Sequence, residues 1–194
     1  MSKLDRAALW SLEDYAERRS DFRAEVIAHK KHRRVALGAN ATVYFEDFKT
    51  MKYQVQEMLR TERIFEGKDI EEELGAYNPL IPDGSNLKAT FMIEYSDADE
   101  RRKALEALVG VEHKLWLQAG EHARVYAIAN EDLERSTEEK TSAVHFLRFE
   151  LPSEQSAALK GGASLIAGID HDNYRVEISP VPANIRESLV NDLD

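Results

Sequence analysis

The second half of this 194-residue chain contains a pattern that occurs twice, and it limits the possible folds more than any other feature. Each copy, at residues 87–130 and 142–180, reads as a strand, a helix and two further strands within about 40 residues. Apolar and polar residues alternate in the first strand of each copy, as expected for a strand that buries one face. Two such units predict antiparallel structure, in one sheet or in two related sheets, with helices packed against it.

The residues before the repeat are mostly helical in pattern. Apolar residues at helical spacing precede Ser20 and Asp21, whose side chains suit a helix N-cap, so two helices are expected before the first strand. The segment 35–45 resembles a short β-hairpin. A long helix is then expected over residues 48–65, where apolar residues recur at steps of three and four.

A stretch containing prolines and a glycine, residues 77–86, separates the two halves because it cannot be regular structure. It divides the chain into a mostly helical subdomain with a hairpin, residues 1–80, and a sheet subdomain, residues 81–194. Pro182 is placed to open a C-terminal helix that packs back on the sheet. The predicted fold is therefore α+β, with both subdomains in one compact unit.

The long helix carries an acidic residue on its apolar face. Glu62 follows Met58 by four residues, so helical geometry directs its side chain toward the core. An unpaired carboxylate buried there would cost several kcal/mol. We therefore expect Glu62 to pair with a cation such as Arg33, Arg34 or Arg63.

Composition excludes several classes of protein. The chain has no cysteine, which rules out disulfides, thiolate zinc sites and cysteine-ligated iron–sulfur clusters carried by the chain itself. No secretory signal and no apolar run of membrane-spanning length occurs, so a cytoplasmic location away from membranes is expected. A net charge of -10 argues against a general nucleic-acid binder. No cofactor motif is evident, and any metal would need His, Asp or Glu ligands.

The densest polar cluster is basic and lies at the end of the second expected helix. It contains Lys30, Lys31, Arg33 and Arg34, in a 34-residue segment with nine Lys/Arg and six Asp/Glu. Cations at a helix C-terminus complement the helix dipole, so a solvated helix end accounts for the cluster. The functional alternative is a docking site for an acidic partner or a phosphate-bearing ligand, because the cluster focuses positive potential on an otherwise acidic chain.

Two histidines in the same region suggest a metal site. His29 and His32 are three residues apart and can project from one helical face. Glu62 would complete a site of two histidines and one carboxylate for a transition metal if the long helix packs nearby. Paired surface histidines are the alternative interpretation.

The stretch 77–86 also has the composition of a ligand-holding loop. Its prolines restrict the backbone around four polar side chains: Asn78, Asp83, Ser85 and Asn86. Long loops between packed elements often bind ligands. A plain connector between the subdomains explains the same residues.

Several segments make the chain similar to a known bacterial family. Residues 33–38 read RRVALG and residues 54–63 read QVQEMLRTER, both within the run from 29 to 65, and residues 77–90 and 138–151 extend the match. The chain resembles the family called domain of unknown function 3501 over nearly its whole length. Members of that family are encoded beside a rubrerythrin-like di-iron protein and an iron–sulfur oxidoreductase, which implies a role near peroxide defence or electron transfer.

These observations favour an accessory or interaction protein in an oxidative-stress redox system, docking through the basic cluster to rubrerythrin-like or iron–sulfur partners. A metal-binding protein or metal-dependent enzyme using His29, His32 and Glu62 is the alternative. A third hypothesis is a small-molecule sensor with its ligand between the helical half and the sheet half. Free sheet edges would also permit a homodimer.

Overall fold

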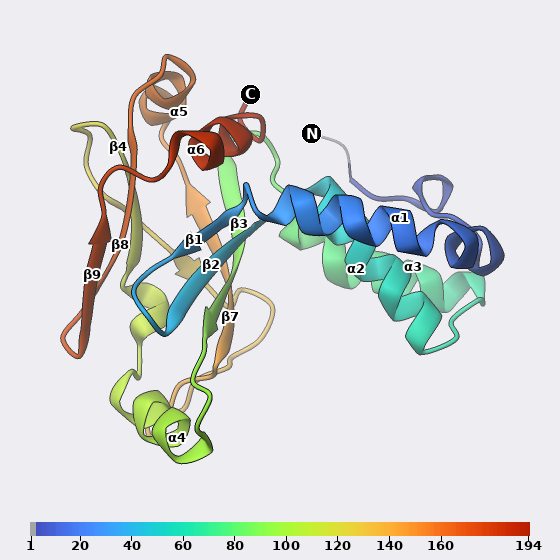
Figure 1. The fold of residues 1–194 in the computed structure, drawn as a ribbon, viewed down its shortest axis with the longest axis horizontal. Helices are drawn as coiled ribbons and strands as arrows, with labels where there is room; N and C mark the ends of the chain where they lie inside the picture. Colours follow the sequence, from blue (N-terminus) through green and yellow to red (C-terminus); the bar gives the residue numbers. More distant parts are fainter. Residues whose placement is uncertain (1–2) are drawn as a thin grey trace.

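Residues 3–194, which the computed structural model describes, form six α-helices and nine strands. Three helices, α1 to α3, lie together on one side of the molecule (Figure 1). The strands form two antiparallel sheets that share one apolar core, and α6 lies near the C-terminus. The predicted α+β class, with a helical N-terminal region, antiparallel sheet and a C-terminal helix, is confirmed.

The first helix is longer than the sequence pattern suggested. A single helix α1 covers Leu12–Lys30, and the Ser11 side chain caps it by accepting the Asp14 amide at 3.1 Å. The expected break at residues 20 and 21 was wrong because the buried face continues through Tyr15, Phe22 and Val26. A polar pair on the exposed side of a helix does not end it when the apolar face is continuous.

Helix α2 (Phe48–Thr61) is shorter than expected. Its start is fixed by a capping box, in which Asp47 accepts the Thr50 amide and Thr50 Oγ1 accepts the Asp47 amide, both at 2.9 Å. Arg63 adopts φ 55° and turns the chain, after which α3 (Gly67–Tyr77) begins. Glu62 is exposed at the C-cap of α2, so the prediction that it faces the core was wrong.

The first sheet has five strands in the order β1-β2-β3-β7-β6, and the second has four in the order β5-β4-β8-β9. The strands of the first sheet are β1 (Arg34–Ala36), β2 (Ala41–Glu46), β3 (Asn86–Ile93), β7 (Val144–Glu150) and β6 (Ile128–Ala129). Those of the second are β4 (Leu115–Ala119), β5 (Val125–Tyr126), β8 (Leu165–His171) and β9 (Tyr174–Ile178). Helices α4 (Ala98–Ala107), α5 (Ser153–Lys160) and α6 (Ala183–Val190) connect or follow them.

The two halves of the repeat are divided between the two sheets. Each half starts with a strand of the first sheet, passes through α4 or α5, and continues with two strands of the second sheet. The equivalent strands β3 and β7 pair antiparallel, and so do β4 and β8. Of the two arrangements that the repeat allowed, one sheet or two, the chain adopts two.

The hairpin β1–β2 joins the first sheet because β2 pairs with β3 along its whole length, from Ala41 opposite Ile93 to Glu46 opposite Lys88. The hairpin therefore lies on the sheet side although it precedes residue 80. Short links on either side of it, at the end of α1 and at the start of α2, connect the sheet to the helical unit.

Side chains on alternate positions of the first sheet point to different environments. The inner set faces the second sheet and is fully buried: Val43, Phe45, Ala89, Phe91, Leu147 and Phe149. The helical unit has separate small cores around Val55 and around Tyr15. Within residues 3–194 no helix has the length and apolar character needed to cross a membrane.

Candidate functional site

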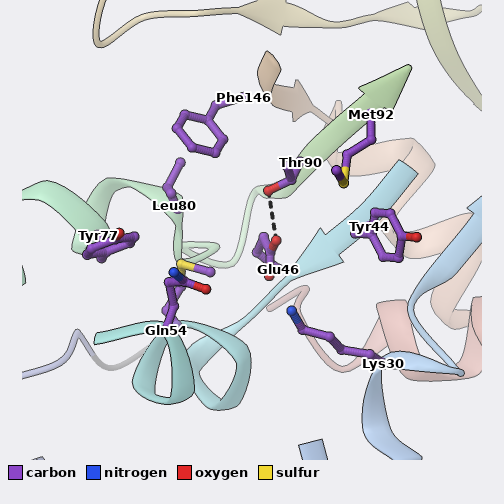
Figure 2. Close-up of a pocket in the computed structure, with 10 residues that line it drawn as sticks. Lys30, Tyr44, Glu46, Gln54, Tyr77, Leu80, Thr90, Met92 and Phe146 are labelled. Atoms are coloured by element: carbon purple, nitrogen blue, oxygen red, sulfur yellow. Dashed lines mark hydrogen bonds between the residues drawn. The ribbon is translucent and has the colours of Figure 1, made fainter. Parts of the chain in front are cut away.

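A cavity of about 420 Å³ lies between the helical unit and the outer face of the first sheet (Figure 2). Its sheet wall is built by strand alternation, because the residues between the inward-facing ones point outward. Tyr44, Thr90 and Phe146 form one row across β2, β3 and β7. Glu46 and Met92 flank this row. The sheet thus presents a mixed polar and apolar surface to the cavity.

The opposite wall comes from the helices. Met51 and Gln54 project from the first two turns of α2, and Tyr77 and Leu80 come from the end of α3 and the short 3-10 turn η2 (Asn78–Leu80). Lys30, the last residue of α1, closes one side. Residues distant in sequence meet here only because α1 and α2 flank the hairpin on the outer side of the sheet.

Glu46 is the group in this cavity whose hydrogen bonding is incomplete. Its side chain is 5 % exposed, and Oε1 accepts a hydrogen bond from Thr90 Oγ1 at 2.7 Å. Oε2 is buried and has no hydrogen-bond partner among the residues that the structure describes. Buried polar atoms in native proteins are nearly always paired, so a free carboxylate oxygen facing a cavity indicates a missing partner.

Two lysines lie near Glu46 without pairing with it. Lys88 stands directly opposite Glu46 in the β2–β3 register. The ammonium of Lys30 points toward the Glu46 carboxylate across the cavity. Within residues 3–194, the side chain of neither lysine forms an ion pair within 4 Å or a hydrogen bond, and neither lysine pairs with Glu46 Oε2. A carboxylate and an ammonium therefore face the same space with room between them.

A buried ion network borders the cavity behind Glu46. Arg33 is 2 % exposed and donates to the carbonyl oxygens of Phe45 at 3.0 Å and Glu46 at 3.1 Å. Its guanidinium also binds the carboxylate of Asp192 and lies 3.4 Å from that of Asp47. The network joins the end of α6 to β2 and to the start of α2, and so holds the helical unit against the sheet.

The two carboxylates of this network differ in pKa. Burial raises the pKa of Asp192 to about 6, although the charge of Arg33 acts in the other direction. Burial also acts to raise the pKa of Asp47, but Arg33, the Thr50 amide and His29 together outweigh it and lower that pKa below its usual range. Arg33 therefore has a structural role, as the buried cation that both carboxylates share.

The basic cluster is divided by this arrangement. Arg33 is buried and Lys30 lines the cavity, whereas Lys31 and Arg34 are exposed. The guanidinium of Arg34 lies 5.8 Å from the centre of the Tyr44 ring, in cation–π contact at the edge of the cavity. An exposed docking surface made by all four cations is therefore not present.

The three residues proposed as metal ligands are separated. His29 Nε2 lies 2.5 Å from Asp47 Oδ2, and His32 Nδ1 lies 3.1 Å from Asn184 Nδ2. His29 therefore lies at the N-terminal end of the 14-residue α2, which Asp47 caps, whereas Glu62 caps its C-terminal end. The two ends are about 21 Å apart along the helix. Residues 3–194 contain no group of three or more His, Asp or Glu side chains placed to hold a metal ion.

The polar residues of the stretch 77–86 bind other parts of the protein. Asn78 exchanges two hydrogen bonds with the Leu4 backbone, at 2.7 and 2.8 Å. Asp83 accepts from Ser85, while Ser85 and Asn86 donate to Glu150. These contacts suit a connector. The stretch reaches the cavity through Tyr77 and Leu80, and none of the four predicted polar residues lines it.

A second buried polar cluster has a complete set of partners. His145 is 0 % exposed and contacts Asn130 at 2.9 Å and Thr141 at 2.9 Å. The Glu112 carboxylate accepts from Ser136 and Thr141. Burial lowers the pKa of His145, which favours the neutral ring. With every carboxylate oxygen paired, the cluster anchors the loop after β6.

Sequence reasoning missed Glu46, Tyr44 and Thr90 as site residues because no local pattern shows that the outer face of this sheet borders a cavity. One signal was available: the same outer face also carries Met92 and Phe146. An outward face with large apolar side chains is usually covered by another element. Because this signal comes from a short segment of sequence, it does not indicate which element covers the face.

Comparison with known proteins gives a family and a closely similar structure. The family model described as "Protein of unknown function (DUF3501)" matches residues 3–193. A crystal structure of a protein of unknown function from Burkholderia pseudomallei is 51% identical, with a TM-score of 0.95 and 100% of both chains covered. No curated protein matches significantly. Because the family model covers almost the entire sequence, the chain belongs to the DUF3501 family, as the resemblance predicted.

Proposed function

We propose that this protein is a ligand-binding accessory protein whose ligand occupies the cavity between the helical unit and the first sheet. The buried Glu46 carboxylate, with its unpartnered oxygen aimed into the cavity, is the observation that carries the proposal. Cavities of a few hundred Å³ with apolar walls and a few placed polar groups are typical ligand sites. The proposal agrees with the hypothesis of a small molecule held between the two halves.

The cellular setting that we propose is the cytoplasmic oxidative-stress or electron-transfer system implied by the family's gene neighbours. A chain without cysteine cannot hold an iron–sulfur cluster by its own thiolates, so rubrerythrin-like and iron–sulfur partners would carry the redox centres. Lys31 and Arg34, exposed beside the cavity, are the remaining candidates for partner contact. A partner bound at Lys31 and Arg34 would then lie close enough to the cavity to respond to a bound ligand.

Complementation of a deletion strain under peroxide tests the proposal. Met92→Trp fills the cavity without removing the Thr90–Glu46 hydrogen bond, and Ile166→Trp places the same bulk on the outer face of the second sheet as a control. We expect the control to restore peroxide resistance and Met92→Trp to fail, with both proteins folded by circular dichroism. Full rescue by Met92→Trp would reject the cavity as the functional site, and a deletion without a peroxide phenotype would reject the redox setting.

Partner contact is tested separately. Lys31→Glu combined with Arg34→Glu should reduce recovery of the neighbouring gene products in a pull-down by at least about tenfold, because reversed charges repel an acidic surface. Lys160→Glu combined with Arg175→Glu changes the net charge equally at exposed positions elsewhere. Equal recovery with both double variants would reject Lys31 and Arg34 as the docking site.

A further inference from the structure

The cavity presents two opposite charges, and both lack a partner. Glu46 Oε2 has none, as described above. Lys30 is half-buried, points toward Glu46, and forms no hydrogen bond or ion pair with any residue from 3 to 194. If the two groups completed each other they would be in contact. Instead the space between them is open to a ligand.

We infer that the ligand of this cavity is a zwitterionic α-amino acid with a large apolar side chain, its ammonium bound to Glu46 and its carboxylate bound to Lys30. This inference rests on the proposed ligand-binding function. A simple cation would satisfy Glu46 but would face the charge of Lys30, and a simple anion would satisfy Lys30 but would face Glu46. A ligand that carries both charges pairs each group at once and leaves no buried charge uncompensated.

The walls of the cavity define the rest of the ligand. Met51 comes from α2 and Met92 from β3, and Leu80 and Phe146 complete an apolar surface. Methionine side chains adapt to ligands of different shape, so both aromatic and long aliphatic side chains fit this surface. Gln54 and the Tyr77 hydroxyl supply neutral polar groups at the edge.

Isothermal titration calorimetry on the full chain tests the inference with L-phenylalanine, L-methionine and L-leucine as probes. 2-Phenylethylamine and 3-phenylpropanoate carry one charge each and serve as matched comparisons for L-phenylalanine. We expect at least one amino acid to bind, and the amine and the acid to bind about 10- to 100-fold more weakly, as expected for the loss of one hydrogen-bonded charge pair.

Three variants assign the charges. Glu46→Gln should weaken amino-acid binding by about 10- to 100-fold. Lys30→Met should bind L-phenylalanine only about as tightly as the wild-type protein binds 2-phenylethylamine. Lys88→Met removes the lysine opposite Glu46, which lies outside the cavity lining, and should leave binding unchanged.

Several outcomes would overturn the inference. If 2-phenylethylamine binds as tightly as L-phenylalanine, and Lys30→Met leaves the affinity for L-phenylalanine unchanged, the ligand is a simple cation. If none of the three amino acids binds, the ligand is of another class. In that case the complementation result with Met92→Trp decides whether the proposed function survives, because that measurement does not depend on ligand identity.

Discussion

The inner and outer faces of the first sheet are made by the same strands and behave differently. The inner face meets the second sheet and packs side chains such as Phe45, Phe91 and Phe149 with essentially no exposure. The outer face meets the helical unit over only part of its area and leaves a cavity with the unpaired oxygen of Glu46. Complete packing on one face supplies stability, and incomplete packing on the other leaves room for a ligand.

The largest expected effect tests this difference directly. Phe91→Ala removes a fully buried ring from the inner face and should lower the free energy of unfolding by about 5 kcal/mol. Met92→Ala, at the next position of the same strand, should cost about 1 kcal/mol because its neighbours already border a cavity. Urea denaturation measures both values, and equal losses would show that the two faces are packed alike.

The next effect concerns how the helical unit is attached beside the outer face. Arg33→Met leaves the carboxylates of Asp47 and Asp192 without their shared guanidinium. We expect a loss of about 4 kcal/mol in the free energy of unfolding, because uncompensated buried charges are strongly destabilising. Arg34→Met, at the exposed neighbour, is the control and should cost well under about 1 kcal/mol. A small loss for both would mean that the network does not fasten the helical unit.

Asp192 should make this attachment depend on pH. Its pKa is raised to about 6 in the fold, so the folded protein holds the proton more tightly than the unfolded chain does. The group therefore favours the fold fully below about pH 4 and loses this contribution as the pH rises through about 6.

Asp192→Asn removes that titration while the other charged groups of the network, Arg33, Asp47 and His29, remain. Relative to the wild type, the variant should gain about 2 kcal/mol in unfolding free energy between about pH 4 and pH 7. Urea denaturation at a series of pH values measures the difference. Parallel curves for the two proteins would contradict the raised pKa.

The smallest effect has the opposite sign. Glu46→Leu removes a buried carboxylate that has one unpaired oxygen, at the expense of the Thr90 hydrogen bond. We expect a gain of about 1 kcal/mol in stability together with loss of complementation, because buried charges are often less stabilising than apolar residues of similar volume. A loss of stability greater than about 1 kcal/mol would assign Glu46 to structure, and the two faces of the sheet would then differ less than proposed.

Much of the fold was predictable from local pattern. Alternation over residues 87–95 and 143–151, in the first strand of each copy of the repeat, predicted the central strands β3 and β7. Helix ends were less predictable. The end of α2 depends on the left-handed conformation of Arg63, which the continuing apolar spacing did not indicate.

The candidate site was predictable only in part. Lys30 belonged to the basic cluster, but its position in a cavity wall depends on where α1 ends relative to β2. The sequence suggested Glu62 as a partner for Arg33, whereas the structure pairs Arg33 with Asp192, more than 150 residues later in the chain. Contacts of that separation leave no local pattern in the sequence.

By itself the sequence determined the α+β class, the repeated strand–helix–strand–strand unit and the absence of thiol chemistry, because periodicity and composition are local properties. Tertiary structure alone decided that the repeat forms two sheets and that the helices cover one outer face incompletely. It also decided that Glu46 and Lys30 face the same cavity. The physical reason is that a cavity is a relation between surfaces far apart in the chain, and only packing brings those surfaces together.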